Sequence, residues 1–146
     1  MRNFDSQNPT IFFVTQPYIF KFPEIGTPEI GFITVAENYK NLPFEIKRVF
    51  WTHSIPSHAV RGNHAHYLNQ QILIALQGTV TVQTISANGE KNTFELQSPN
   101  EALYLPPHVW REMKYSENAL QLVLSSEPYN EADYIRNFPE FQNHWK

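Results

Sequence analysis

The sequence predicts an all-β protein, a small barrel or jelly roll with one short C-terminal helix. Its 146 residues are about the length of one domain. Short runs rich in β-branched and aromatic residues recur along the chain, and turn residues separate them. The 11 prolines and the scarcity of long helical patterns also favour short strands joined by tight loops. Several short strands at such spacing are typical of a sandwich or barrel.

The expected domain spans residues 1–146, and residues 1–28 are expected to form an N-terminal arm. Two short apolar runs, residues 11–14 and 18–20, are punctuated by prolines. One interpretation is an edge strand or arm of the same subunit. The other is an arm that packs on a second subunit, because aromatic side chains at this density rarely stay exposed to water. The second interpretation favours a homodimer.

The expected strands follow the arm at even spacing. They cover residues 30–36, 46–51, 70–76, 79–85, 93–96, 102–105 and 120–125. Asn88 and Gly89 form the strongest short-range signal of a hairpin turn. The one helical candidate is the segment 131–141, in which Tyr134 and Phe138 have helical spacing. We expect Pro139 to cut this helix short.

Composition excludes several classes of function. The net charge is −3 and no basic stripe is present, so broad nucleic-acid binding is not expected. No apolar run approaches the roughly 18 residues of a membrane helix, so no membrane partner is expected. The sequence has no cysteine and no signal-peptide pattern, which fits a cytoplasmic protein.

The segment 60–66 carries the richest chemistry. If it is a strand, His64 and His66 project to the same face, about 6.5–7 Å apart along the chain. Two imidazoles on one concave face can hold a metal or move protons near neutral pH. The alternative is a pair of solvated surface histidines. Arg61 and Gly62 before the pair, and the apolar run after it, favour a functional site.

A resemblance to the cupins becomes visible in these residues. The order Gly-x-His-x-His, then Gln71, then Gly78, resembles the first cupin motif, in which metal-binding members have a glutamate at the position of Gln71. In the second motif, Arg111 stands where a ligand histidine would be. Gln is a poor ligand for transition metals, and Arg is a permanent cation. The comparison therefore implies no metal and no cofactor, and it favours proton transfer.

The more specific resemblance is to the sugar-nucleotide 3,4-ketoisomerases, WxcM-like cupins that act on TDP-4-keto-6-deoxyglucose. It rests on the segments 41–49, Arg61–His66, 103–113 and 129–136. It covers roughly residues 30–141. It implies an isomerase of deoxysugar and polysaccharide biosynthesis that converts a nucleotide-linked 4-keto-6-deoxy sugar, most simply a TDP-sugar, into its 3-keto isomer. The reaction would proceed through an enediol without a cofactor.

The residues can be given roles in that chemistry. We expect His64 to be the base and His66 its partner, one imidazole neutral and the other protonated. Arg48 and Arg61 are candidates for the diphosphate, with barrel-rim arginines as the alternative. The other candidate substrate-binding residues are Gln71, Tyr104, Trp110 and Arg111. For Tyr104 and Trp110 the alternative is a place in the core. Tyr129, Asp133, Tyr134 and Arg136 are expected to form a closing C-terminal element with a structural role.

Three departures from the family pattern leave a second hypothesis open. The segment 27–30 lacks the arginine and glycine that the family has there. Phe50 and Trp51 stand where the family has tyrosine, and Arg111 often corresponds to a histidine. Each change removes a polar contact to a keto-sugar nucleotide. The alternative function is therefore a non-catalytic or differently specific cupin that binds a sugar nucleotide; a metal-dependent cupin such as a dioxygenase is disfavoured.

Overall fold

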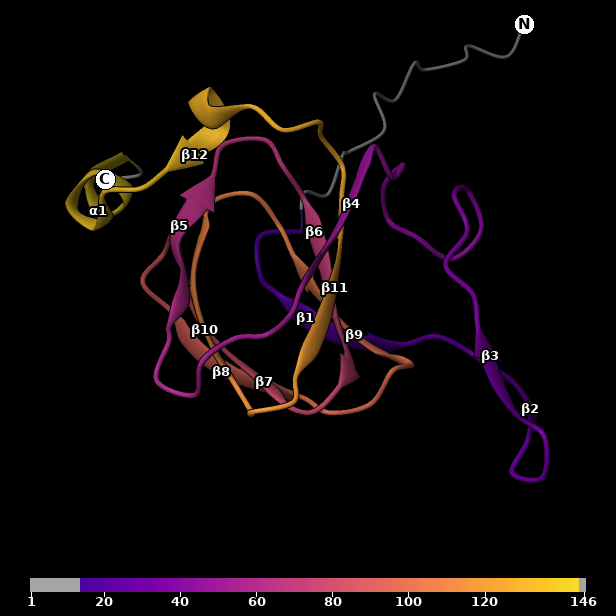
Figure 1. Ribbon diagram of the computed structural model, residues 1–146. Coiled ribbons are helices and arrows are strands. Elements are labelled where there is room, and N and C mark those ends of the chain that lie inside the picture. Colours follow the sequence, from indigo (N-terminus) through magenta and orange to yellow (C-terminus); the bar gives the residue numbers. More distant parts are fainter. Residues whose placement is uncertain (1–13, 145–146) are drawn as a thin grey trace, which may run out of the picture.

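The computed structural model describes residues 14–144, which form two five-stranded antiparallel sheets and a separate hairpin. Figure 1 shows the two sheets facing each other around a common interior. The first sheet consists, in spatial order, of β1 (Tyr18–Lys21), β9 (Glu101–Leu105), β6 (Gln71–Gln77), β11 (Leu120–Ser125) and β4 (Arg48–Thr52). The second consists of β12 (Tyr134–Ile135), β5 (Arg61–His66), β10 (Val109–Tyr115), β7 (Val80–Ser86) and β8 (Lys91–Leu96). The predicted all-β class is confirmed.

The main hydrophobic core lies between the two sheets. In β7, Val80 and Val82 are buried while the intervening residue is less so, which is the alternation expected of a strand with one face on the core. The first sheet contributes Leu73, Leu103 and Val123 to the same cluster. The candidate site lies in the same interior, where residues of both sheets line a cavity.

Two smaller apolar clusters cover the outer faces. On the first sheet, Ile72 and Tyr104 pack under Phe44 from the connection between β3 and β4. On the second sheet, Ala65 and Trp110 pack against the C-terminal helix α1 (Phe138–His144). The helix is thereby fixed beside β5 and β12.

The N-terminal region takes part in the first sheet. The run 11–14 lies outside the described residues except for Val14. Tyr18–Lys21 is strand β1, which pairs antiparallel with β9 at the edge of the sheet. This part of the expected arm is thus an edge strand of the first sheet, and packing of the arm on a second subunit stays a prediction.

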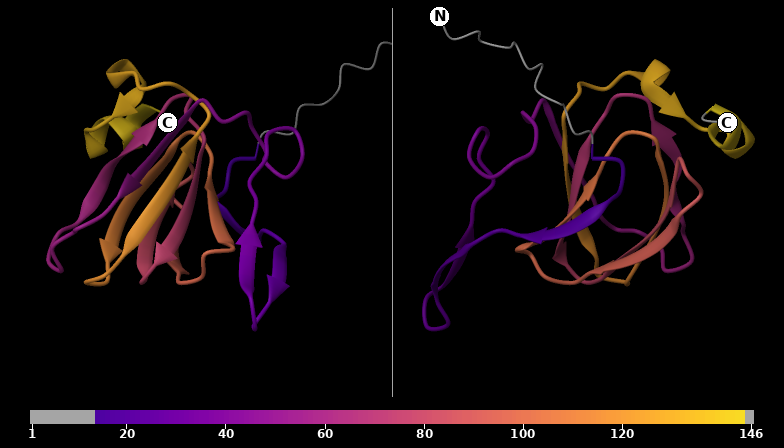
Figure 2. Two further views of the ribbon diagram at one scale, coloured as in Figure 1. Left: turned by 45° about the vertical axis from the view of Figure 1, so that its right-hand side comes forward. Right: turned by 180° about the vertical axis from the view of Figure 1, so that it is seen from behind.

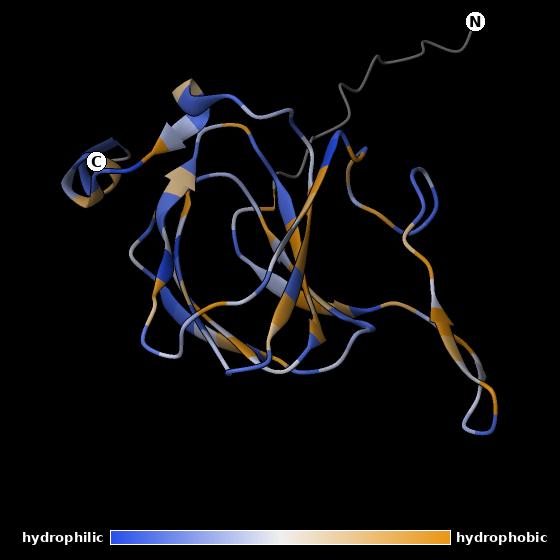
Figure 3. Cartoon of the chain, in the orientation of Figure 1, coloured by the Kyte–Doolittle hydropathy of each residue, from blue (hydrophilic) through white to orange (hydrophobic). Residues whose placement is uncertain are grey.

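A projecting hairpin follows β1. It consists of β2 (Glu24–Thr27) and β3 (Gly31–Thr34), and Figures 1 and 2 show it standing away from the barrel. Figure 3 shows hydrophobic residues along it. Ile30, Ile33 and Ile25 are 84%, 64% and 60% exposed, so the hairpin presents apolar side chains to water.

The C-terminal helix prediction is right in kind and wrong in extent. Residues Glu131–Asp133 form a 3-10 turn, η1, and Tyr134–Ile135 is the extended strand β12. The helix α1 begins at Phe138 and contains Pro139 in its first turn, where the missing N–H of proline has no helical partner to lose. Pro139 thus helps to start the helix. Within residues 14–144 no helix is long and apolar enough to cross a membrane.

Candidate active site

The two histidines of β5 lie next to each other on its inner face. Their ring centroids are 4.9 Å apart and the ring planes are almost perpendicular. On one side of β5, His64 pairs with Arg111 of β10; on the other, His66 pairs with Tyr134 of β12. Ala65, between them, points into the outer cluster under α1. The predicted arrangement of two imidazoles on one face is present.

A β-bulge at Gly62 and Asn63 sets the position of His64 opposite Arg111. Between Arg111 and Glu112 of β10, the register on β5 shifts from His64 to Gly62, so Asn63 is the extra residue. Both Gly62 (φ 90°) and Asn63 (φ 55°) have left-handed backbone conformations. A side chain at Gly62 would bring its Cβ to 2.7 Å from the carbonyl oxygen of Arg111. Glycine is therefore required for β5 and β10 to approach this closely.

Arg111 supplies a buried permanent charge beside His64. Its Nη1 donates to Oε1 of Gln71 at 2.8 Å and lies 3.5 Å from Nε2 of His64. Gln71 is itself held, because its Nε2 donates to the hydroxyl of Ser125. Burial lowers the pKa of Arg111 to about 10, so the guanidinium stays charged at neutral pH. Its buried Nη2 has no hydrogen-bond partner among the described residues, which leaves it able to bind an oxygen of a ligand.

His64 is neutral and has a defined tautomer. Its Nδ1 lies 2.9 Å from the carbonyl oxygen of Gly62. A carbonyl only accepts, so Nδ1 carries the proton and Nε2 presents its lone pair to the interior. Burial, and then the charge of Arg111, lower the pKa of His64 to about 3. At neutral pH this imidazole is a base.

His66 is completely buried and is also held neutral. It has no exposed surface, and burial followed by the charge of Arg111 lowers its pKa strongly. Its Nδ1 lies 3.2 Å from Oδ2 of Asp133, a polar contact without the alignment of a hydrogen bond. The ring of Tyr134 packs at 4.4 Å from it. The expectation of one neutral and one protonated imidazole therefore differs from these electrostatics, which favour two neutral rings.

A cavity of about 230 Å³ opens beside His64 between the sheets. Both sheets line it, with Phe50 and Thr52 from β4, Arg61, Gly62 and His64 from β5, Gln71 and Leu73 from β6, Met113 and Tyr115 from β10, Gln121 and Val123 from β11, and Tyr134 and Arg136 from the C-terminal segment. The wall combines one apolar side with several donors and acceptors. Tyr115 donates to Oε1 of Gln121 at 2.8 Å, which fixes part of this polar wall. Such a mixture is typical of a small-molecule site.

Three of the predicted substrate-binding residues meet at this site, and a fourth, Arg48, lies near it. Gln71 and Arg111 contact each other beside His64, and Arg61 lines the cavity. Arg48 lies at the start of β4, with its guanidinium carbon 5.4 Å from the ring centroid of Phe50 and 5.7 Å from that of Tyr129. Its Nε is buried without a hydrogen-bond partner in the described part of the chain.

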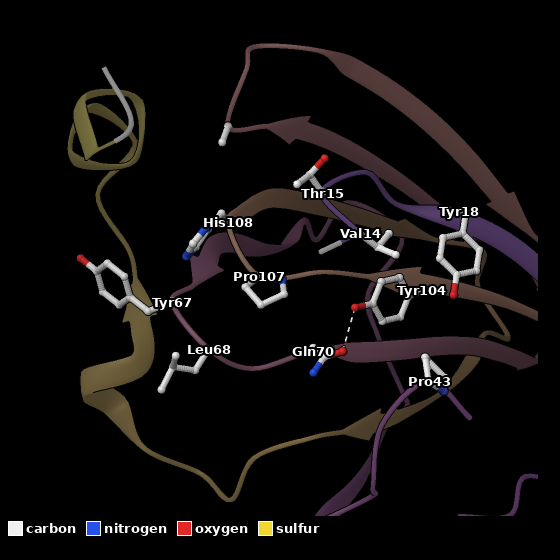
Figure 4. Close-up of a pocket in the computed structure, with 11 residues that line it drawn as sticks. Val14, Thr15, Tyr18, Pro43, Tyr67, Leu68, Gln70, Tyr104, Pro107 and His108 are labelled. Atoms are coloured by element: carbon white, nitrogen blue, oxygen red, sulfur yellow. Dashed lines mark hydrogen bonds between the residues drawn. The ribbon is translucent and has the colours of Figure 1, made fainter. Parts of the chain in front are cut away.

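Tyr104 and Trp110 lie elsewhere. Trp110 packs on Phe138 and Phe141 of α1, on the outer face of the second sheet. Tyr104 lies on the outer face of the first sheet, where its hydroxyl donates to Oε1 of Gln70 at 2.8 Å. Figure 4 shows Tyr104 in a different and larger cavity, of about 720 Å³, with Tyr18, Pro107 and His108. The structure therefore favours the packing alternative for both aromatic residues.

The C-terminal segment contributes site residues that the sequence analysis took as structural. The Tyr134 ring packs at steep angles against both histidines, with its centroid 5.0 Å from that of His64 and 4.4 Å from that of His66. Arg136 lies over the Tyr134 ring at 4.3 Å and lines the cavity. It also pairs with Glu131, which accepts from the hydroxyl of Tyr129 at 2.6 Å. The repeated Tyr and Arg of the segment 129–136 were the available signal.

The donor set does not suit a metal. The charged guanidinium of Arg111 stands 3.5 Å from the Nε2 of His64 that would be the ligand atom. In the part of the chain that the structure describes, no group of three or more His, Cys, Asp or Glu side chains is placed to hold a metal ion.

Comparison with known proteins finds a matching family and a relative of known activity. The profile of a family described as FdtA, WxcM-like, C-terminal, matches residues 15–146. A TDP-4-oxo-6-deoxy-alpha-D-glucose-3,4-oxoisomerase of Aneurinibacillus thermoaerophilus is 36% identical over 127 residues, which are 86% of this chain and 90% of that protein.

Solved structures give the same picture. QdtA, a sugar 3,4-ketoisomerase from Thermoanaerobacterium thermosaccharolyticum solved in complex with TDP, is 36% identical with a TM-score of 0.83, over 88% of this chain and 93% of QdtA. WlaRB, a TDP-quinovose 3,4-ketoisomerase from Campylobacter jejuni, is 35% identical with a TM-score of 0.82, over 88% of this chain and 98% of WlaRB.

Proposed function

This chain belongs to the FdtA family of WxcM-like proteins, and from that premise we propose that it is a 3,4-ketoisomerase of a TDP-linked 4-keto-6-deoxy sugar. One observation carries the proposal. Two neutral imidazoles lie beside a buried guanidinium, and the His64 imidazole lines a cavity between the sheets. That arrangement supplies a base and a fixed positive charge, which are what the isomerisation needs.

The reaction balances without a redox partner. A neutral imidazole removes the proton from C3 of the sugar; the C3–H electron pair forms the C3–C4 double bond, and the C4 carbonyl pair moves to O4. The Nη2 of Arg111, which has no partner among the described residues, is placed to stabilise that oxyanion. A proton then passes from O3 to O4, the C3 carbonyl forms, and the imidazolium returns its proton to C4. A single imidazole thus serves as base and then as acid, and its N–H can exchange with solvent before the proton is delivered at C4.

The nucleotide end of the substrate requires cations at the cavity mouth. Arg61 and Arg136 line the cavity, and Arg48 lies near Tyr129 of the C-terminal segment. We assign these guanidinium groups to the diphosphate, because their paired donors match phosphate oxygens. We further propose that the protein is a cytoplasmic homodimer and that it acts in deoxysugar and polysaccharide biosynthesis.

The test follows proton exchange into TDP-4-keto-6-deoxyglucose in deuterated solvent by NMR. Wild-type protein is expected to introduce deuterium and form the 3-keto isomer. His64→Asn and His66→Asn should each lower the rate by about 10² to 10⁴, the usual contribution of general acid–base groups. His58→Asn is the matched control, because His58 is exposed and does not line the cavity.

A binding function without catalysis is the second candidate. It is favoured by Phe50, a cavity residue without the hydroxyl that the family resemblance places on this strand. TDP-sugar binding by calorimetry without any exchange would establish this candidate and contradict the isomerase.

A further inference from the structure

Asp133 joins the C-terminal segment to the buried histidine. Its Oδ1 accepts from the backbone N–H of Leu68 at 2.7 Å, and its Oδ2 accepts from that of Asn69 at 3.1 Å. The same Oδ2 lies 3.2 Å from Nδ1 of His66. The backbone carbonyl of Asp133 also accepts from the N–H of Tyr67 at 3.0 Å. The carboxylate is thus fixed by the segment that follows β5 and meets His66 from one defined side.

The contact decides which ring nitrogen of His66 carries the proton. A neutral imidazole has one N–H and one lone pair. A lone pair on Nδ1 facing a carboxylate oxygen at 3.2 Å would be repelled, whereas an N–H there is attracted. Nε2, which is buried and has no hydrogen-bond partner within the described residues, then keeps its lone pair.

The other groups around His66 do not make this choice. Three of these groups are cations: Arg111 of β10, Arg48 of β4 and Arg136 after β12. The fourth, His64 of β5, competes with His66 for a proton. These groups oppose protonation of the ring as a whole. Asp133 is the carboxylate in contact with the ring, and it touches Nδ1.

We propose that Asp133 is the positioning residue of the site: it holds His66 in the tautomer with the proton on Nδ1, so that the buried Nε2 keeps its lone pair as an acceptor. The proposal rests on the proposed isomerase function only for its kinetic consequence. When Nε2 takes a proton from the substrate, the Nδ1 proton stays between the ring and the carboxylate of Asp133. The structural consequence holds for the protein without substrate.

The first experiment reads the tautomer directly. In long-range proton–nitrogen NMR spectra of the wild-type protein at neutral pH, we expect His66 with a protonated Nδ1 and an unprotonated Nε2. In Asp133→Asn, the amide keeps one acceptor oxygen for Leu68 and turns an NH₂ group toward Nδ1, and the hydrogen bond from the backbone N–H of Asn69 is lost. The proton of His66 should then move to Nε2.

The second experiment measures turnover. In a catalytic triad, exchange of the aspartate for asparagine selects the wrong histidine tautomer and lowers kcat about 10⁴-fold. We expect a loss of about 10² to 10⁴ in kcat for Asp133→Asn, with a much smaller change in KM.

Asn69→Ala is the matched control. The Oδ1 of Asn69 accepts from the N–H of Glu127 at 3.2 Å and contacts the Ser126 hydroxyl at 3.5 Å, so its removal loosens the same segment without touching His66. We expect the wild-type tautomer and a rate within a few-fold of wild type.

A His66 protonated on Nε2 in the wild type, or an unchanged tautomer in Asp133→Asn, overturns the proposal. Equal losses of kcat in Asp133→Asn and Asn69→Ala would show that Asp133 only stabilises the local structure, which contradicts the positioning role. Absence of isomerase activity in the wild type would contradict the proposed function and leave the tautomer measurement decisive for Asp133.

Discussion

Positive charge outweighs negative charge around each histidine of the site. Arg111 and Arg136 both disfavour protonation of His64, and Arg111, Arg48 and Arg136 do so for His66. Burial acts in the same direction and is the larger cause for both rings. The pair is therefore unprotonated through the physiological range, and loss of the neutral base requires strongly acidic solution.

Replacement of Arg111 tests this balance. Arg111→Gln removes a cation from the side of His64 and so raises the pKa of His64 from about 3 toward its ordinary value. Because the neutral imidazole is the active form, the acid limb of the pH–rate profile should move to higher pH. The rate at neutral pH should also fall, by about 10² to 10³, if the guanidinium stabilises the oxyanion. Proton exchange measured from about pH 2.5, below the His64 pKa of about 3, up to pH 8 checks both effects, and an unshifted acid limb would contradict the electrostatic assignment.

The residues of the site divide by whether a short sequence motif carries them. His64, His66, Gln71 and Arg111 could be predicted, because short motifs with fixed spacing carry them. Asp133 could not, because its role depends on contacts with Leu68, which is 65 residues away. Trp110 was placed among the substrate-binding candidates because Val109–Tyr115 was not recognised as a strand. In a strand, neighbours point to opposite faces, so Arg111 inside requires Trp110 outside.

At the scale of elements, the bulge in β5 and the short strand β12 shape the site. The bulge uses Gly62 and Asn63 to bring His64 opposite Arg111. Strand β12 then covers the other edge of β5, with Tyr134 opposite His66. Most strands could be predicted from alternation and turn signals. Strand β12 could not, because two residues are too few for a periodic pattern and their pairing partner lies in β5.

Gly62→Ala and Gly89→Ala form a matched pair that tests the bulge. Both glycines have similar backbone conformations, with φ of 90° and 87°. A Cβ at Gly62 meets the Arg111 carbonyl oxygen at 2.7 Å, whereas one at Gly89 meets nothing within 4 Å. Both variants should lose about 1–3 kcal/mol through backbone strain, and Gly62→Ala should lose more because β5 and β10 must separate.

Urea unfolding measures the free-energy difference between these two variants, and proton exchange measures its effect on the site. We expect Gly89→Ala to keep wild-type exchange and Gly62→Ala to lose most of it. Equal stability and equal exchange in the two variants would show that the close approach of the strands does not matter.

At the scale of the whole molecule, the barrel encloses its site but leaves the hairpin β2–β3 uncovered. A two-stranded hairpin alone is at best marginally stable in water. Phe32 and Thr34 on one face border a groove of about 480 Å³, whose other wall includes Ile74, Leu76 and Leu122 of the first sheet. Ile25 and Ile33 are directly paired on the opposite face and point away from this groove. The exposed outer face of the first sheet adds Trp51, which is 62% exposed.

These uncovered apolar residues favour a second copy of the chain as their partner. Closed two-fold assembly presents the same patch on both subunits, so hairpin and sheet of one copy can cover those of the other. We therefore expect sedimentation equilibrium at micromolar concentration to give twice the chain mass of 17.1 kDa. Ile33→Asp places a charge in the patch and should shift the mass to that of one chain. Tyr39→Asp is the control, because Tyr39 is 82% exposed and lies outside the hairpin. It should remain dimeric.

A wild-type monomer would contradict the expectation of a dimer. If Tyr39→Asp dissociates the dimer and Ile33→Asp does not, the interface includes the region of Tyr39 and not the hairpin.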